Sequence, residues 1–175
     1  VAVDFFSRLG IGAMEIGTVT LKSQIGNPTP RVFRYTSEES IRNAMGFPGP
    51  GLTQTIKNLN SIQSPTTLGI NIGKNKNSIG VNAINDYQML AKNLAPIADY
   101  LVINISSPNT PGLRDWQEVS KLREILASIR ELNISKPILI KIAPDLDDIQ
   151  LNAMIDFVKK ENIGLMATNT TIIKE

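Results

Sequence analysis

Residues 99–114, Asp-Tyr-Leu-Val-Ile-Asn-Ile-Ser-Ser-Pro-Asn-Thr-Pro-Gly-Leu-Arg, decide how the rest of the chain is interpreted. They begin with an apolar, β-favouring run at 100–103, which predicts a buried strand. Small hydrogen-bonding side chains follow, and Pro108, Pro111 and Gly112 turn the backbone between them. Parallel α/β enzymes build sites at the carboxyl ends of their strands in this way. An ordinary turn rich in Asn, Pro and Gly would have the same pattern.

The composition indicates one globular domain that lacks several common chemistries. The chain has 175 residues, of which 42% are hydrophobic, and a formal net charge of +2, too small to indicate a nucleic-acid partner. It contains no Cys and no His, which excludes disulfides, thiolate chemistry and a Ser–His pair. We expect no metal site, and no apolar run is as long as a membrane span.

Apolar periodicity predicts strands and helices that alternate along the chain. Such alternation is typical of a parallel sheet with right-handed crossovers. Strands are expected at 13–20, 67–72, 100–103, 137–144 and 164–171. Helices are expected at 1–9, 37–43, 52–62, 84–97, 116–132 and 149–158, and a short hairpin near 31–34.

These units could form an open sheet or a (β/α)₈ TIM barrel. Polar residues end four consecutive strands, at intervals close to one βα unit: Asn71, Asn104, Lys141 and Asn169. No strand-to-helix turn carries the G-x-G-x-x-G dinucleotide fingerprint, so we favour the barrel. The chain is expected to supply about five of the eight strands. We therefore predict one partial (β/α)₈ domain over 1–175, truncated at both ends.

The polar residues at the strand ends suggest a ligand. Lys141 lies inside an apolar run, where an unpaired ammonium is costly, so it either reaches solvent or faces a ligand that is or becomes anionic. Asn71, Asn104, Asn109 and Asn169 each offer an amide donor and acceptor. Converging amides suit a planar ligand such as a flavin or a pyrimidine, although a single strand-end Asn is more often a turn former.

Two serines, Ser106 and Ser107, follow the 100–103 strand. Because the chain has no His or Cys, either serine would need water, Thr110 or a polarising ligand to act as a base.

The acidic residues of the chain suggest structural roles. We interpret Asp145, Asp147 and Asp148 as acids at a helix start, with Asp145 able to cap that helix. Glu15, inside a predicted strand, must either pair with a cation or face water.

Residues 104–114 resemble the signature of the dihydroorotate dehydrogenases, the flavoenzymes of pyrimidine synthesis. Other segments resemble this family in the family's order, so the resemblance covers essentially the whole chain. They are 15–20, 26–34, 43–47, 68–76, 141–145 and 167–171. The Ser-Ser-Pro-Asn-Thr form resembles the quinone-using, membrane-associated class 2 enzymes, whereas the soluble class uses a Cys base.

The resemblance implies a (β/α)₈ barrel that binds FMN at the carboxyl ends of its strands. The implied reaction is oxidation of (S)-dihydroorotate to orotate in de novo UMP synthesis, with FMN as hydride acceptor and a quinone as final acceptor. Ser107 would remove the C5 proton while hydride leaves C6. Lys141 would stabilise negative charge on the reduced flavin.

The resemblance assigns the other site residues to FMN or to the substrate. FMN would contact Thr18, Asn71, Asn104, Lys141 and Thr168. The substrate would contact Asn43, Ala44, Met45, Gly46, Phe47, Asn104, Asn109, Asn169 and Thr170.

The chain also differs from the family pattern. Pro48 stands where the family usually has Asn, which leaves the path of the 46–51 loop open. We expect a substrate-contacting Lys and the helical pair that admits quinone to lie upstream of Val1, and the glycine loops for the FMN phosphate to follow Glu175. The 175-residue chain alone is therefore not expected to bind FMN tightly or turn over. The whole protein is expected on the cytoplasmic face of a bacterial inner membrane, attached peripherally through a segment absent from this chain.

Two alternative functions stay open at this point. Another FMN barrel reductase, directed at dihydrouracil or another dihydropyrimidine, would differ in substrate preference, because orotate's carboxylate needs its own site. A non-catalytic pyrimidine-binding barrel would bind orotate without flavin.

Overall fold

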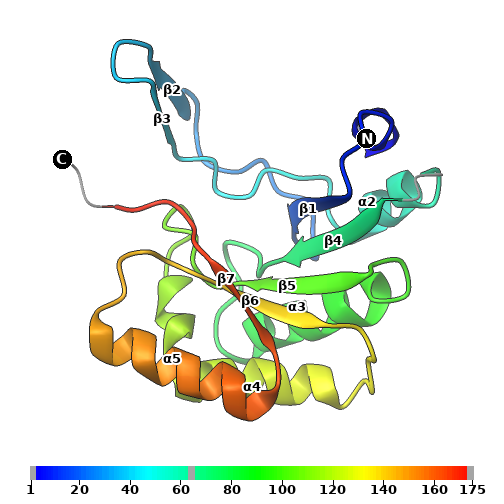
Figure 1. Cartoon of the computed structure of the whole chain (residues 1–175), viewed down its shortest axis with the longest axis vertical. Coiled ribbons are helices and arrows are strands. Elements are labelled where there is room, and N and C mark those ends of the chain that lie inside the picture. Colours follow the sequence, from blue (N-terminus) through cyan, green and yellow to red (C-terminus); the bar gives the residue numbers. More distant parts are fainter. Residues whose placement is uncertain (1–2, 63–65, 173–175) are drawn as a thin grey trace.

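A single parallel sheet forms the centre of the computed structural model, which describes residues 3–62 and 66–172. Its five strands lie in the order β1-β4-β5-β6-β7 (Figure 1). They are β1 (Ala13–Val19), β4 (Thr67–Ile72), β5 (Tyr100–Asn104), β6 (Ile138–Ile142) and β7 (Gly164–Ala167). All four pairings are parallel, which agrees with the predicted partial barrel.

Helices follow the strands and cover one face of the sheet. Figure 1 shows α3, α4 and α5 packed side by side on that face. The helices are α1 (Val3–Ser7), α2 (Leu52–Leu59), α3 (Val81–Leu94), α4 (Val119–Arg130) and α5 (Asp148–Glu161), with a 3₁₀ helix η1 (Arg114–Gln117) before α4. No helix within 3–62 and 66–172 is long and apolar enough to cross a membrane.

The strand register separates an apolar face from a polar one. Side chains alternate across each strand, so Ile70, Leu101 and Ile103 face the helices while their neighbours face the other way. These three side chains are completely buried in the core. On the opposite face Asn104 of β5 lies beside Lys141 of β6. The predicted polar residues therefore lie together at the carboxyl ends of the strands.

The predicted helix at 37–43 is wrong. The segment instead turns at 36–39, with Glu39 at φ 47, and continues into a strand. Strands β2 (Val32–Tyr35) and β3 (Ser40–Asn43) form an antiparallel hairpin that projects from the sheet (Figure 1). A seven-residue segment is too short for a stable isolated helix, and the hairpin ladder satisfies its backbone groups instead.

The predicted cap of α5 is also wrong by two residues. Asp147 is the N-cap, because its side chain accepts from the backbone N–H of Gln150 at 2.7 Å and the Gln150 side chain accepts from Asp147 N–H. This reciprocal capping box satisfies two of the donors exposed at the helix start. Asp145 is thereby available for a different contact.

Tyr87 of α3 connects the helical layer to the end of β5. Its side chain is fully buried, and its hydroxyl donates to the carbonyl oxygen of Asn104 at 2.9 Å. Burial raises the pKa of Tyr87 above its usual value, so the phenol remains a neutral donor.

We predict that Tyr87→Phe lowers the free energy of unfolding by about 1–3 kcal/mol, because a buried carbonyl loses its donor. Denaturant unfolding of the full-length protein measures the change. Tyr35→Phe, on the exposed hairpin, is the matched control and should change the stability by less than about 0.5 kcal/mol. Equal effects at the two positions would contradict the prediction.

Candidate active site

A recess of about 290 Å³ lies at the carboxyl ends of the strands. Most of the predicted site residues line it, although they come from distant parts of the sequence. The lining residues are Gly17, Thr18, Asn43, Met45, Gly46, Phe47, Pro48, Asn104, Ser107, Asn109, Lys141, Asn169 and Thr170. The structure therefore brings one predicted base, amides from three loops and one cation to a common space.

Three of the predicted FMN residues form a hydrogen-bonded chain across β5, β1 and β4. Asn104 Nδ2 donates to Thr18 Oγ1 at 2.9 Å, and Thr18 Oγ1 donates to Asn71 Oδ1 at 2.7 Å. Asn71 Nδ2 donates to Glu15 Oε1 at 2.9 Å. Glu15 lies exposed on the edge strand β1, which agrees with the expectation that it faces water. Asn71 lies behind Thr18 and does not line the recess.

Ser106 fixes the other end of the Asn104 amide. Both the N–H and the hydroxyl of Ser106 donate to Asn104 Oδ1 at 3.2 Å. Asn169 Nδ2 donates to Ser106 Oγ at 3.1 Å, which links the end of β5 to the segment after β7. The orientation of Asn104 is therefore set by partners at both its donor and its acceptor atoms.

Ser107, the predicted base, is 5% exposed and lines the recess. Its Oγ accepts from the backbone N–H of Asn109 at 3.3 Å. Within residues 3–62 and 66–172 the hydroxyl donates to no other group, so its proton can be directed into the recess. A donor on Oγ favours negative charge on that oxygen.

The β2–β3 hairpin (residues 32–43), called the arm below, contributes to one wall of the recess through Asn43. Asn109 Nδ2 donates to Asn43 Oδ1 at 3.2 Å, so the arm is attached to the loop after β5. Asn27 Nδ2 donates to the carbonyl oxygen of Asn109 at 3.0 Å. Sequence reasoning missed Asn27 as a site residue, although its segment was among those that resemble the family.

The side chain of Gln24 holds the start of the 46–51 loop. Gln24 Nε2 donates to the carbonyl oxygens of Gly46 and Phe47 at 3.1 and 3.0 Å. Ala44 donates its N–H to the carbonyl oxygen of Arg31 at 2.8 Å and, unlike its neighbours, does not line the recess. Pro48 is a lining residue, so the loop with the atypical Pro still reaches the site.

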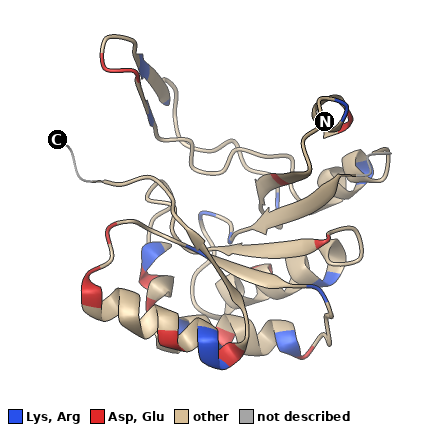
Figure 2. Cartoon of the chain, viewed as in Figure 1, with Lys and Arg blue, Asp and Glu red and all other residues tan. Residues whose placement is uncertain are grey.

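Lys141 lines the recess and is the charged side chain among its lining residues. Only two charged residues occur within the five strands, Glu15 and Lys141, and Figure 2 shows the other charges mainly on the helices, loops and hairpin. The ammonium of Lys141 makes no hydrogen bond or ion pair within the part of the chain that the structure describes. Its side chain is partly exposed and lines the recess, which fits both the solvent-reaching and the ligand-facing interpretation.

Lys74 is the most buried lysine among residues 3–62 and 66–172, and sequence reasoning missed it. It is 2% exposed, and its Nζ lies 3.4 Å from the carbonyl oxygen of Pro111. Burial lowers the pKa of Lys74, and the negative charges of Asp86 and Asp115 partly oppose this shift. The signal was the run Gly-Lys-Asn-Lys directly after a buried strand.

The loop after β7 carries the last predicted residues. Asn169 and Thr170 line the recess, and Asn169 Oδ1 accepts from the Thr170 N–H at 2.8 Å. Thr168 is exposed and lies outside the recess lining. Among residues 3–62 and 66–172 no group of three or more acidic side chains could hold a metal ion.

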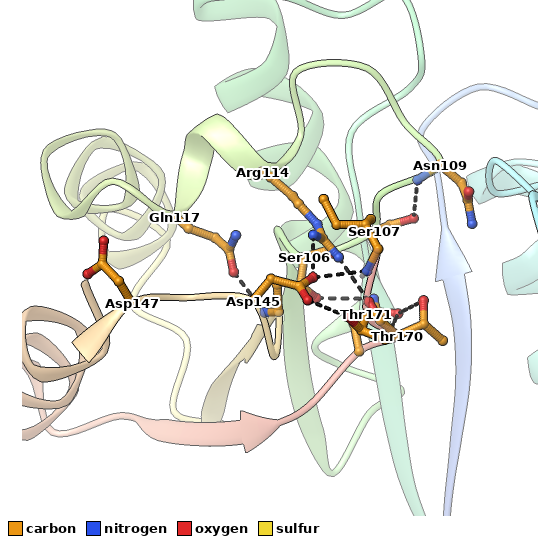
Figure 3. A network of polar contacts seen from close by, with 12 residues as sticks. Ser106, Ser107, Asn109, Arg114, Gln117, Asp145, Asp147, Thr170 and Thr171 are labelled. Carbon is orange, nitrogen blue, oxygen red and sulfur yellow. Dashed lines mark hydrogen bonds and ion pairs between the residues drawn. The ribbon is translucent and has the colours of Figure 1, made fainter. Parts of the chain in front are cut away.

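An ion pair joins the loops after β5, β6 and β7 beside the recess (Figure 3). Arg114 Nη1 lies 2.7 Å from Asp145 Oδ2, and the same carboxylate accepts from the Thr171 hydroxyl and the Ile172 N–H. Asp145 is therefore not a helix cap, and Arg114 was missed because its partner is distant in sequence. The hydrogen bond from Thr171, followed by the contacts with Arg114, holds the pKa of Asp145 below its usual value.

Comparison with known proteins identifies the family of the chain. The family model described as "Dihydroorotate dehydrogenase" matches residues 2–175. The chain belongs to the dihydroorotate dehydrogenase family. This membership confirms the resemblance of the 104–114 signature, and the family is flavin-dependent in general.

Several curated relatives of this chain are named "Dihydroorotate dehydrogenase (quinone)". The Corynebacterium diphtheriae protein is 49% identical over 172 residues, which are 98% of this chain and 47% of that protein. The Idiomarina loihiensis protein is 44% identical over 182 residues, which are 99% of this chain and 54% of that protein. A crystal structure of the Eimeria tenella dihydroorotate dehydrogenase in complex with ferulenol has a TM-score of 0.89 at 33% identity, and the match covers 97% of this chain and 53% of that one. The chain thus spans about half the length of the curated relatives it matches.

We predict that Thr18→Val destabilises the protein by about 1–3 kcal/mol, because it removes the hydroxyl between two buried amides. Thr18→Ser keeps that hydroxyl and is the control, with a loss of less than about 1 kcal/mol. Denaturant unfolding of both variants measures the difference. If Thr18→Val were as stable as Thr18→Ser, the hydrogen bonds through Thr18 Oγ1 would contribute nothing to the free energy of unfolding.

The pH dependence of the Arg114–Asp145 pair follows from the lowered pKa of Asp145. A carboxylate with a depressed folded pKa stabilises the fold above its unfolded pKa, whose ordinary value is 3.8, and this contribution is lost as the pH falls through the folded pKa. We predict that the stability difference between wild type and Asp145→Asn is constant from about pH 6 to pH 9 and shrinks below about pH 4. Urea unfolding across this range measures it, and a difference that grows in acid would contradict the assignment.

Proposed function

We propose that the protein containing this chain oxidises (S)-dihydroorotate to orotate, with FMN as hydride acceptor and a quinone as final electron acceptor, in de novo pyrimidine synthesis. One observation carries the proposal: Ser107, Lys141 and four Asn side chains converge on one recess in a chain of this family. The names of the curated relatives supply the quinone.

The residues present fit FMN. Thr18 and Asn104 line the recess with polar atoms whose orientation is fixed, and Asn71 supports Thr18 from behind. The ammonium of Lys141 has no partner among residues 3–62 and 66–172, which suits a ligand that gains negative charge. Thr168, at the end of β7, is the remaining proposed contact. When bound, FMN would accept the hydride that leaves substrate C6.

Ser107 is the proposed base for the C5 proton. Its hydroxyl is nearly buried, so water competes weakly for it, and the Asn109 N–H donates to the same oxygen. This donor stabilises the negative charge that develops on Oγ as the proton of the hydroxyl is given up. Because the sequence contains no His or Cys, the proposed acceptor of the Ser107 hydroxyl proton is water or the Thr110 hydroxyl, and Ser107 Oγ then takes the C5 proton of the substrate.

The substrate ring is proposed to lie against the amides of the arm and of two strand-end loops. Asn43, Asn109 and Asn169 supply donors and acceptors from three directions, and the Thr170 hydroxyl lies beside them. The backbone from Met45 to Phe47 would complete this wall. A planar pyrimidinedione has the alternating N–H and C=O groups that such amides recognise.

We also propose that quinone reaches the flavin through a segment outside these 175 residues. The whole protein would then be a peripheral membrane protein on the cytoplasmic face of a bacterial inner membrane. The quinone named for the curated relatives supports this proposal.

The test is an anaerobic titration of the flavin-loaded full-length protein with dihydroorotate. We predict that the flavin absorbance bleaches, and that Ser107→Ala slows this bleaching by about 10²–10⁴-fold while flavin stays bound, because a general base is lost. Stopped-flow absorbance measures the rate.

Ser120→Ala, on the exposed side of α4, is the control and should react like wild type. Unchanged reduction in Ser107→Ala would remove Ser107 as the base. A flavin band that dihydroorotate does not bleach would favour another dihydropyrimidine as substrate, and orotate binding without any flavin would favour a non-catalytic protein.

A further inference from the structure

Arg114 contacts three strand-end segments at once. Its Nε donates to the carbonyl oxygen of Ser106 at 3.0 Å, and its Nη2 donates to the carbonyl oxygen of Thr170 at 2.9 Å. Its Nη1 pairs with Asp145 at 2.7 Å (Figure 3). A guanidinium can make these three contacts together because its donors point outward from a rigid plane.

Both carbonyls that Arg114 holds adjoin proposed site residues. Ser106 directly precedes Ser107, and Thr170 directly follows Asn169. Ser106 is completely buried, and all its polar atoms have partners: Asn104 accepts from its N–H and hydroxyl, Asn169 donates to that hydroxyl, and Arg114 donates to its carbonyl. The direction of the Ser106–Ser107 peptide therefore depends on Arg114.

Asp145 keeps the arginine in this position. Its carboxylate is 12% exposed and also accepts from the Thr171 hydroxyl and the Ile172 N–H. It thus neutralises Arg114 and anchors the chain that follows Thr170. Gln117 also connects η1 to the end of β6, because its Oε1 accepts from the Ala143 N–H at 2.8 Å.

We propose that the Arg114–Asp145 pair is a positioning device for the reaction. It fixes the Ser106–Ser107 peptide against the Asn169–Thr170 segment, so that the base and the substrate amides keep one relative geometry. The inference rests on the proposed function. Neither residue lines the recess, so neither is a catalytic residue.

Substitutions of Arg114 test the device in the flavin-loaded full-length protein. Arg114→Gln is expected to lower the limiting rate of flavin reduction at saturating dihydroorotate at least tenfold per bound flavin, since a displacement of about 1 Å can cost about 10²-fold. Arg114→Lys should fall between wild type and Arg114→Gln, because an ammonium can pair with Asp145 without spanning both carbonyls. A rate equal to wild type in Arg114→Lys would overturn the proposal even where Arg114→Gln does not fold.

Arg130→Gln is the matched control. Arg130 pairs with Glu161 and donates to the Glu161 carbonyl oxygen at 2.8 Å, so it makes the same types of contact at the ends of α4 and α5. A general loss of stability would affect both variants. The positioning role predicts that Arg130→Gln keeps the wild-type rate within about twofold, because its contacts lie far from the reacting groups.

Hydrogen exchange separates this inference from the proposed function. Exchange of the peptides covering 104–113 and 164–172 should rise in Arg114→Gln and stay unchanged in Arg130→Gln. Unchanged exchange in Arg114→Gln would overturn the positioning device. Wild-type flavin that dihydroorotate does not reduce would overturn the proposed function, and the catalytic part of this inference with it, whatever the exchange shows.

Discussion

The arrangement of this site depends on the hydrogen bonds of Asn104. Its amide donates to Thr18 of β1 and accepts from Ser106, while its backbone carbonyl accepts from Tyr87 of α3. One residue thus connects the edge strand, the signature loop and the helical layer. Asn104 is 3% exposed, so each unmade bond would cost about 1–3 kcal/mol, and the alternatives to this geometry are correspondingly unfavourable.

Because side chains alternate along each strand, one face of the sheet packs in the core and the other carries polar side chains of the site. The face toward α3, α4 and α5 is apolar and completely buried at its centre, whereas the opposite face carries Asn71, Asn104 and Lys141. The hydrogen bond from Tyr87 to the Asn104 carbonyl oxygen connects the two faces. A rigid apolar layer therefore supports polar side chains that remain available to a ligand.

Hydrogen bonds between loops complete what the strands begin. The arm reaches the recess through Asn43, whose side chain accepts from Asn109, and the segment after β7 reaches it through Asn169. Arg114 and Asp145 hold the outer side of the same loops (Figure 3). The recess is thus formed by residues of β1, β5 and β6, by the loops after β5 and β7, and by the chain from the end of the hairpin to Pro48, and its geometry depends on these cross-loop contacts.

The sequence by itself determined the alternation of strands and helices, the polar strand ends and the family, because periodicity and the 104–114 signature are local. Only the tertiary structure decided the roles of Arg114 and Asp145, which are 31 residues apart, and the burial of Lys74. Local rules placed a helix at 37–43 and a cap at Asp145, but cross-strand pairing and the capping box of Asp147 satisfied the backbone groups better. Such partners depend on the whole fold, because the residues that contact each other in space are distant in the sequence.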